Sequence, residues 1–289
     1  MRSSPSPASA GADASTADAS LTRFIEQVDR SFRRDAPQSF WDLEGELHRL
    51  VASGFHGELL DRELKKLAAN PNHMGDWRTN QLVVHRGRGF ALAIWLLDRP
   101  RQYIHTTPFF GMYAPVGTES LHYDIYRLPA GYCNDVFDPT LRLEAAGSGV
   151  TRPGEILRLE ADRYTYDFKA ERPVPVVKFT AAAFQHLEWL FDKGTLQAWQ
   201  ANDSELHWTQ LRVAAYILGK LGHPTSLEPL DLLSTHPHHA VRWAAIQNLG
   251  RLSRDVALNK LESALEDLHP HVRRAAAKAL QQARPKIPD

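Results

Sequence analysis

The chain has 289 residues, of which 43% are hydrophobic and 24% are charged, and its 34 Lys and Arg residues balance 34 Asp and Glu residues. This length and apolar content can bury a substantial core and predict about two domains. A formal net charge of zero argues against nucleic-acid or anionic-membrane binding by bulk charge. Cys133 is the single cysteine and no apolar run reaches the ~18 residues of a membrane span, so we expect a cytoplasmic protein without an internal disulfide.

The amino-terminal part changes from a polar tail to helices. Residues 1–20 are rich in Ser, Ala and Pro and lack an apolar run, which predicts a disordered tail. Residues 21–72 are predicted to form helices that pack on the following domain, with further helices at 40–53 and 58–69. The first helix carries apolar residues at i, i+3, i+4 and i+7: Leu21, Phe24, Ile25 and Val28.

Residues 73–182 alternate apolar and polar side chains and are interrupted by Gly and Pro clusters, which indicates β-structure. The Gly-Ser-Gly run at 147–149 is predicted to be a loop. About eight short strands with turns between them favour a closed barrel or jelly roll with a lumen for a small ligand. The predicted strands are 81–84, 90–97, 103–112, 121–128, 140–143, 155–159, 164–168 and 174–180.

The order of these segments resembles a known family. The runs FALAIWLL, IHTTPFFGMYAPVG, LHYDIYRLP and RPGEILRLEADRYTYDF look like the cupin superfamily, and within it like thiol dioxygenases of the cysteine dioxygenase type. The resemblance covers roughly residues 55–180. It implies an α+β fold with a cupin-like β-barrel or jelly roll, and in that family three histidines hold Fe(II).

The three histidine positions of that family are only partly matched. On this chain they fall on His105, on Thr107 and on Tyr164 or Thr165, with Phe110-Gly111 as the aromatic-Gly step. Hydroxyl groups are poor replacements for imidazole as Fe(II) ligands. We therefore expect a metal-poor barrel without a cofactor.

An alternative iron site remains open. His122 and Asp124 lie two residues apart on a predicted strand, so their side chains share one face and could join His105 as donors for Fe. The opposite face carries the more apolar set of Leu121, Tyr123 and Ile125, which favours a solvent-facing position for His122 and Asp124.

The candidate ligand pocket is the lumen of the predicted barrel. Tyr123 and Arg127 share a strand face and could hold a carboxylate, as an arginine and a phenol do in the family that this region resembles. A surface ion pair is the other interpretation of Arg127. The pocket candidates are His105, Thr107, Tyr123, Arg127 and Tyr164.

Residues 183–206 are predicted to form a helix that connects the barrel to the carboxy-terminal domain. Four apolar residues suggest its buried face, and Gly194 lies where the helix would end. These residues are Phe184, Leu187, Leu190 and Phe191.

Residues 207–285 contain a repeat of 30 to 31 residues. The segments QLRVAAYILGKLG, AVRWAAIQNLGRL and HVRRAAAKALQQA align on Arg212, Arg242 and Arg273. They resemble the short HEAT-like repeats that also occur in phycobilisome lyases, which implies an α-solenoid that binds a protein partner. We expect the arginines to contact acidic groups of a neighbouring repeat, with Asp267 as a candidate.

Histidines gather at equivalent points of two successive repeats. Their recurrence favours exposed loop residues between helices, and a metal site is the alternative. The residues are His236, His238, His239, His269 and His271.

Two functional classes follow. The first is a metal-poor, cupin-like protein that binds a small ligand or has a regulatory role, and whose repeats bind a protein partner or a second copy as a homodimer. The second is a cupin enzyme of the thiol dioxygenase type that acts on a small thiol or an amino-acid-like substrate. The sequence predicts neither a nucleic-acid nor a membrane partner.

Overall fold

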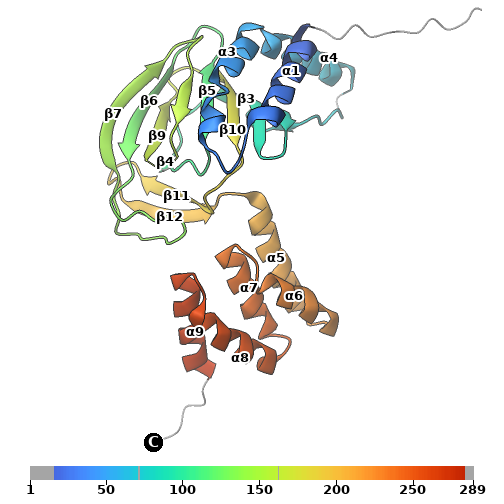
Figure 1. Ribbon diagram of the computed structural model, residues 1–289, viewed down its shortest axis with the longest axis vertical. Helices are drawn as coiled ribbons and strands as arrows, with labels where there is room; N and C mark the ends of the chain where they lie inside the picture. Colours follow the sequence, from blue (N-terminus) through green and yellow to red (C-terminus); the bar gives the residue numbers. More distant parts are fainter. Residues whose placement is uncertain (1–15, 71, 162, 284–289) are drawn as a thin grey trace, which may run out of the picture. The chain divides into compact units, whose positions relative to one another are not determined.

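The computed structural model describes residues 16–70, 72–161 and 163–283 (Figure 1). Within these ranges no helix has both the length and the apolar character needed to cross a membrane. The chain forms two compact units, each of which is described by itself. The first unit consists of Met1–Gln102, Phe109–Arg127 and Ala145–Ala182, and the second of Tyr103–Pro108, Leu128–Glu144 and Ala183–Asp289.

The first unit begins with four helices. The predicted tail is corrected in part, because residues 16–20 already belong to a helix, while residues 1–15 lie outside the described residues. The predicted helix at 40–53 is two helices, since the chain turns at Asp42 and Leu43 between them. The helices are α1 (Thr16–Ser31), α2 (Gln38–Trp41), α3 (Glu44–Ala52) and α4 (Phe55–Ala69).

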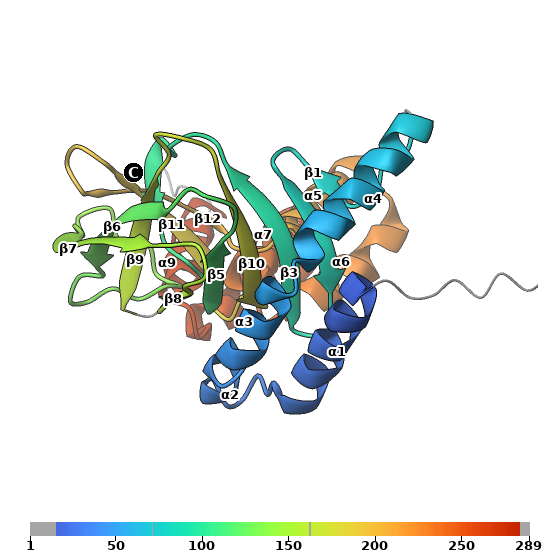
Figure 2. The ribbon, with the colours of Figure 1, turned by 90° about the horizontal axis from the view of Figure 1, so that it is seen from above.

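These helices cover one face of an antiparallel six-stranded sheet (Figure 2). The covering layer is apolar because one stripe of each helix points inward, and Phe24 and Phe40 pack on Phe179 of the sheet with ring centroids 5.1 and 4.7 Å apart. The strands, in spatial order, are β1 (Trp77–Arg78), β2 (Gln81–Arg86), β3 (Phe90–Leu97), β10 (Val174–Ala181), β5 (Gly111–Pro115) and β8 (Leu157–Leu159).

A second, three-stranded sheet packs on the other face of the six-stranded sheet. Aromatic rings fill the space between them: Phe168 lies 6.1 Å from Trp95 and 5.7 Å from Tyr113, and 6.1 Å from Tyr123 on its own sheet. The lumen predicted for a ligand therefore contains a packed aromatic core. The strands, in spatial order, are β7 (Glu144–Thr151), β6 (Leu121–Arg127) and β9 (Tyr164–Lys169).

The strands of the described residues form three separate antiparallel sheets, so the closed barrel is corrected to an α+β arrangement of open sheets. Period-two alternation assigns each strand a buried face, but it does not state which strands pair. The predicted strand at 103–112 illustrates this, because it splits into β4 (Tyr103–His105) and β5, which belong to different sheets.

The Gly-Ser-Gly run that predicted a loop lies inside strand β7, whereas the predicted strand at 140–143 has only an isolated bridge at Arg142. The glycines of this run are explained by a close contact with the neighbouring strand. A Cβ atom on Gly149 would lie 2.6 Å from the ring of Tyr123, so only glycine lets this strand approach the neighbouring ring.

The second unit contains a three-stranded antiparallel sheet of β4, β11 (Leu187–Asp192) and β12 (Ala198–Asp203), in the order β12-β11-β4. The predicted connecting helix at 183–206 is therefore wrong. Trp189, Leu190 and Phe191 are consecutive and all buried, which suits a strand covered on both faces better than an amphipathic helix. The turn after β11 is closed by Asp192, whose carboxylate accepts hydrogen bonds from the Gly194 and Thr195 amides.

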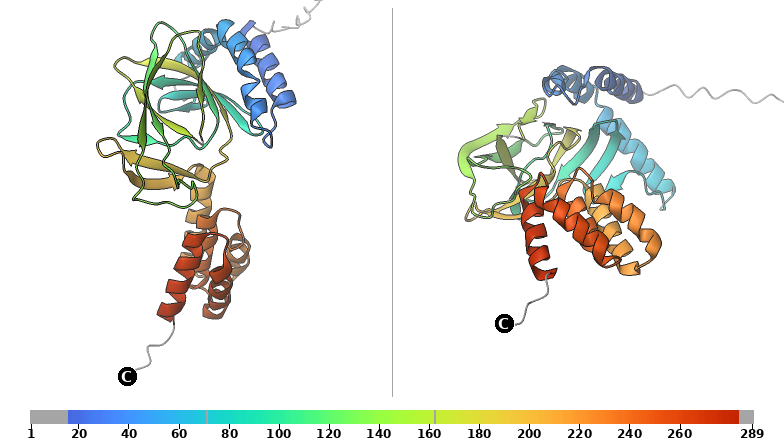
Figure 3. Two further views of the ribbon diagram at one scale, coloured as in Figure 1. Left: turned by 60° about the vertical axis from the view of Figure 1, so that its left-hand side comes forward. Right: turned by 60° about the horizontal axis from the view of Figure 1, so that its bottom comes forward.

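The rest of the second unit is helical, as the repeat predicts. Figure 3 shows its last helices lying side by side, and Ala215, Leu230, Ala245 and Leu249 form a core between them. The helices are α5 (Leu206–Leu221), α6 (Leu227–Leu233), α7 (His239–Leu249), α8 (Arg254–Ser263) and α9 (Pro270–Ala283), with short 3-10 turns at Pro224–Ser226 and Ala264–Glu266.

The predicted contact between an arginine and the next repeat is confirmed. Arg242 donates two hydrogen bonds, of 2.6 and 2.9 Å, to the carboxylate of Asp267, 25 residues further on. The same guanidinium donates to the carbonyl oxygens of His236 and Pro237. Arg242 thus joins the turn before its own helix to the turn before α9.

Candidate functional site

The five predicted pocket residues are divided between the two units. His105 and Thr107 belong to the second unit, whereas Tyr123, Arg127 and Tyr164 belong to the first. They therefore form two small groups rather than one set within a single unit.

His105 ends strand β4 and is partly buried. Its Nδ1 lies 3.2 Å from a carboxylate oxygen of Glu188 on β11, the neighbouring strand. Thr107 follows two residues later, is partly buried, and lies in the segment between β4 and β5. This group supplies one imidazole and one carboxylate.

In the first unit, Tyr123 is part of the core and its hydroxyl lies 3.3 Å from the hydroxyl of Thr151. Arg127 and Tyr164 are direct partners across β6 and β9, at the exposed end of β6. Tyr123 thus belongs to the aromatic core while Arg127 is exposed, and the carboxylate clamp of these two residues remains a prediction.

The alternative donors His122 and Asp124 lie on the outer face of β6. His122 is exposed, and Asp124 forms a 2.9 Å ion pair with Lys169 of β9. Among the described residues no group of three His, Cys, Asp or Glu side chains is placed to hold a metal ion. The residues that the resemblance assigns to Fe(II) therefore do not fit an iron centre, and we derive no step through one.

The histidines of the repeats are corrected from exposed loop residues to buried ones. His238 is 1% exposed and His269 8%, and the other three are partly buried. The rings of four of these histidines form a column with Trp208 from the start of α5, and we call this set the ring column. Its members, in order of contact, are Trp208, His238, His239, His269 and His271.

The rings of this column are in stacking contact. The centroids of Trp208 and His238 are 4.5 Å apart, and those of His239 and His269 are 3.7 Å apart with the ring planes at 3°. His186, in the segment before β11, meets His238 edge-on at 5.2 Å. The column therefore joins the first turns of α5, α7 and α9.

Burial keeps the central imidazoles neutral. Loss of hydration lowers the pKa of His238 to about 4 and that of His239 to about 3. Within the described part of the chain, neither ring nitrogen of His238 and not Nδ1 of His239 has a hydrogen-bond partner. The nearest carboxylate oxygen to His238 belongs to Asp203 and lies 3.8 Å from Nε2.

The column is tied to residues 128–144 of the same unit through Asp135. The backbone oxygen of Asp135 lies 2.6 Å from Nε2 of His269, and its carboxylate lies 3.1 Å from Nδ1 of His186. This hydrogen bond raises the pKa of His186 and lowers that of Asp135. Asp135 and His269 are 134 positions apart in the sequence, so their contact connects the repeats to the sheet-bearing part of the unit.

Sequence reasoning missed Trp208, His186 and Asp135 as members of this cluster. A signal for Trp208 was present: it stands four residues before Arg212, as His238 and His269 stand four residues before Arg242 and Arg273. The equivalent ring position therefore recurs in all three repeats. His186 and Asp135 carry no local pattern, and only the tertiary structure brings them to the column.

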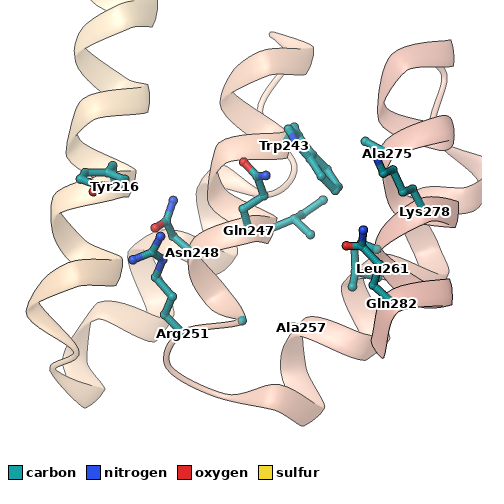
Figure 4. Close-up of a pocket in the computed structure, with 13 residues that line it drawn as sticks. Tyr216, Trp243, Gln247, Asn248, Arg251, Ala257, Leu261, Ala275, Lys278 and Gln282 are labelled. Carbon is teal, nitrogen blue, oxygen red and sulfur yellow. The ribbon is translucent and has the colours of Figure 1, made fainter. Parts of the chain in front are cut away.

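The same helices form a groove with a cavity volume of about 560 Å³ (Figure 4). Trp243 extends from α7 toward α9, and Tyr216 faces α7 from α5. The lining is Tyr216, Trp243, Ile246, Gln247, Asn248, Gly250, Arg251, Ala257, Leu261, Ala275, Lys278, Ala279 and Gln282. We call this surface the helical groove.

The charged residues that line the helical groove are both cationic, Arg251 and Lys278. The guanidinium of Arg251 and the ammonium of Lys220 lie 5.4 and 5.6 Å from the centre of the Tyr216 ring. Such cation–aromatic contacts hold flexible cationic side chains in place. The groove thus combines positive charge, two aromatic side chains and the amides of Gln247 and Gln282.

Comparison with protein families assigns the helical part. Residues 204–281 match the family of HEAT repeats. We call this stretch the HEAT segment; it contains α5 to α8 and most of α9. The search of curated proteins found no match for the chain.

Solved structures that resemble the chain include several cupin-type proteins. A hydroquinone 1,2-dioxygenase from Sphingomonas sp. is 12% identical with a TM-score of 0.30, covering 37% of this chain and 68% of its own. An RmlC-like cupin protein from Ralstonia eutropha is 11% identical with a TM-score of 0.25, covering 45% and 71%. A sugar phosphate isomerase from Acidithiobacillus ferrooxidans, described as putative, is 7% identical with a TM-score of 0.26, covering 46% and 86%. These similarities carry no argument about the activity of this chain.

Proposed function

We propose that the chain is a protein-binding module whose HEAT segment holds an acidic segment of a partner protein in the helical groove. The observation that carries this proposal is the lining of the groove, in which the charged side chains, Arg251 and Lys278, are both cations. Complementary charge on a partner speeds association and selects against basic partners.

The uncharged lining supports a peptide rather than a small anion. Trp243 and Leu261 offer apolar surface, and Gln247 and Gln282 carry amides that can both donate to and accept from a peptide backbone. Aromatic and arginine side chains are also the residues that contribute most at protein interfaces. A partner segment with acidic residues next to one apolar side chain matches this lining.

Selection from a library of random 12-residue peptides on the immobilised full chain tests the proposal. We expect enrichment of peptides with two or more Asp or Glu residues, and binding that weakens as salt rises because exposed charge pairs are screened. Enrichment of basic or charge-free peptides would contradict it.

Charge reversal locates the binding surface. Arg251→Glu and Lys278→Glu should each weaken a selected acidic peptide by about tenfold, and the double variant by more, as measured by fluorescence anisotropy. Arg254→Glu is the matched control, because Arg254 is an exposed arginine of the same segment at the start of α8 and outside the groove. Equal loss in the control variant would assign the binding to overall charge and not to the groove.

The thiol dioxygenase alternative is not proposed, because the alternative donor set includes an exposed His122 and an Asp124 paired with Lys169. The small-ligand pocket remains a prediction at His105, Thr107, Tyr123, Arg127 and Tyr164.

A further inference from the structure

The ring column buries imidazole nitrogens in a way that the binding of a partner does not explain. Protein interiors seldom bury imidazole nitrogens without hydrogen-bond partners, because the lost hydration is not replaced. Here His238 has two such nitrogens and His239 has one, within the described residues. The closed column therefore offers these rings little solvation for a positive charge.

We propose that the ring column is an acid-sensitive clasp, which holds the first turns of α7 and α9 against residues 128–144 at neutral pH and releases them on acidification. The contacts that would part are the stack of His239 on His269 at 3.7 Å and the contact of His269 with the backbone of Asp135 at 2.6 Å. The proposal is independent of the helical groove.

Protonation is compensated only in part inside the closed column, because the nearest carboxylate, that of Asp203, already accepts hydrogen bonds from Thr209 and Arg212. A proton on His238 would place a cation in a nearly fully buried position, with the Asp203 carboxylate 3.8 Å away. A proton on His239 would place a cation face to face with the ring of His269, whose centroid is 3.7 Å away. Opening the column relieves both costs, since each imidazolium is then hydrated.

Charged and titratable groups surround the two central rings on several elements. Asp203 ends β12, His207 lies on α5, Arg242 on α7 and His271 on α9, and the other groups lie in the connecting segments. These other groups are Asp135, His186, His236, Asp267 and His269.

The sign of the pH dependence follows from the direction of the shifts. Burial lowers the pKa of His238 to about 4 and of His239 to about 3, below the ordinary value of 6.5 that they regain when hydrated. The open form therefore binds more protons between these limits, and the closed form is lost as pH falls. Two such groups increase the opening equilibrium constant by about 100-fold per pH unit in the middle of this window.

One pair acts in the opposite direction. Asp135 raises the pKa of His186, so this ion pair favours the closed form below the ordinary histidine pKa and weakens as pH rises through the raised value. We therefore expect the clasp to stay closed in mild acid and to open only when the two buried rings take up protons.

Energy transfer between two dyes on the full chain measures the opening. One dye is attached to the exposed Cys133, two residues from Asp135, and the other to a cysteine introduced by Gln281→Cys at an exposed site on α9. We expect the transfer efficiency to change between pH 6 and about 4.5, to return at neutral pH, and to do so while the circular dichroism of the helices is retained. An unchanged transfer efficiency, or simultaneous loss of the helical signal, overturns the proposal.

The variant His238→Phe/His239→Phe keeps two stacking rings and removes the titratable nitrogens. Its opening midpoint should move to lower pH by at least about one unit, and His122→Gln, an exposed histidine of the first unit, should behave as the unmodified chain. An unchanged opening midpoint in the Phe variant overturns the proposal.

A second variant, His186→Gln, tests the proposal if the Phe variant does not fold. It removes the opposing ion pair with Asp135, so the opening midpoint should rise to higher pH. An unchanged or lower midpoint overturns the proposal.

Discussion

At the residue scale, the close approach of α5 and α7 in the HEAT segment depends on a glycine. Gly219 of α5 is buried, and a Cβ atom added there would lie 2.4 Å from Oδ1 and 2.6 Å from Cβ of Asn248 on α7. Asn248 is held in this position because its amide donates a 2.8 Å hydrogen bond to the carbonyl of Ala244. The small residue therefore sets the distance between α5 and α7.

Gly219→Ala is expected to destabilise the chain although alanine favours helices. The propensity gain of up to about 1 kcal/mol is outweighed by overpacking, which costs about 1–3 kcal/mol. Gly57→Ala in α4 is the control, because nothing lies within 4 Å of its added Cβ, and it should be neutral or stabilising. Urea denaturation measures both, and equal effects of the two substitutions would contradict the packing argument.

At the element scale, Arg242 holds two turns of the HEAT segment together. Its guanidinium contacts the carboxylate of Asp267 and two backbone carbonyls, and the side chains of Arg242 and Asp267 are only 14% and 11% exposed. A shielded, multiply hydrogen-bonded pair of this kind differs from a surface ion pair, since removal of one partner leaves the other charge shielded from water and without its counter-charge.

Arg242→Gln should lower the free energy of unfolding by about 2–4 kcal/mol, because the carboxylate of Asp267 then loses both hydrogen bonds from the guanidinium and retains the one from the backbone amide of His269. Arg33→Gln provides the comparison, since its pair with Asp35 is 70% and 73% exposed and its loss should leave the unfolding midpoint unchanged. Similar midpoints for the two variants would show that the Arg242 contact contributes no more than a surface pair.

At the scale of the whole molecule, the two units have separate apolar cores. Phe179 lies fully buried between the helices and the six-stranded sheet of the first unit, and Leu249 lies fully buried among α5 to α8 of the second. We expect a core substitution to destabilise mainly the unit that contains it, because packing contacts are short-ranged.

Calorimetry of core variants tests this division. Phe179→Ala should destabilise the first unit by about 3–5 kcal/mol and Leu249→Ala the second by about 2–5 kcal/mol. If the units unfold separately, each variant lowers the midpoint of one transition and leaves the other in place. A single transition that both variants shift equally would show that the units unfold together.

Much of the fold could be predicted from the sequence, and the candidate site only in part. The recurrence of Arg212, Arg242 and Arg273 at equivalent positions of the repeat predicted the carboxy-terminal helices and the Arg242–Asp267 contact. The predicted helix at 183–206 failed because Leu187 and Leu190 fit helical spacing, whereas pairing with β4 and β12 makes this segment a strand. The burial of the repeat histidines was missed because it depends on neighbours distant in the chain.

The sequence by itself determined which face of each amphipathic helix is apolar, where the repeats begin, and that an arginine recurs in each repeat. These properties follow from the local spacing of residues. Only the tertiary structure decided which strands pair, that Tyr123 faces an aromatic core, and that Asp135 and His186 meet the ring column. These outcomes depend on contacts between residues far apart in the chain, and such contacts are selected by how the whole unit packs.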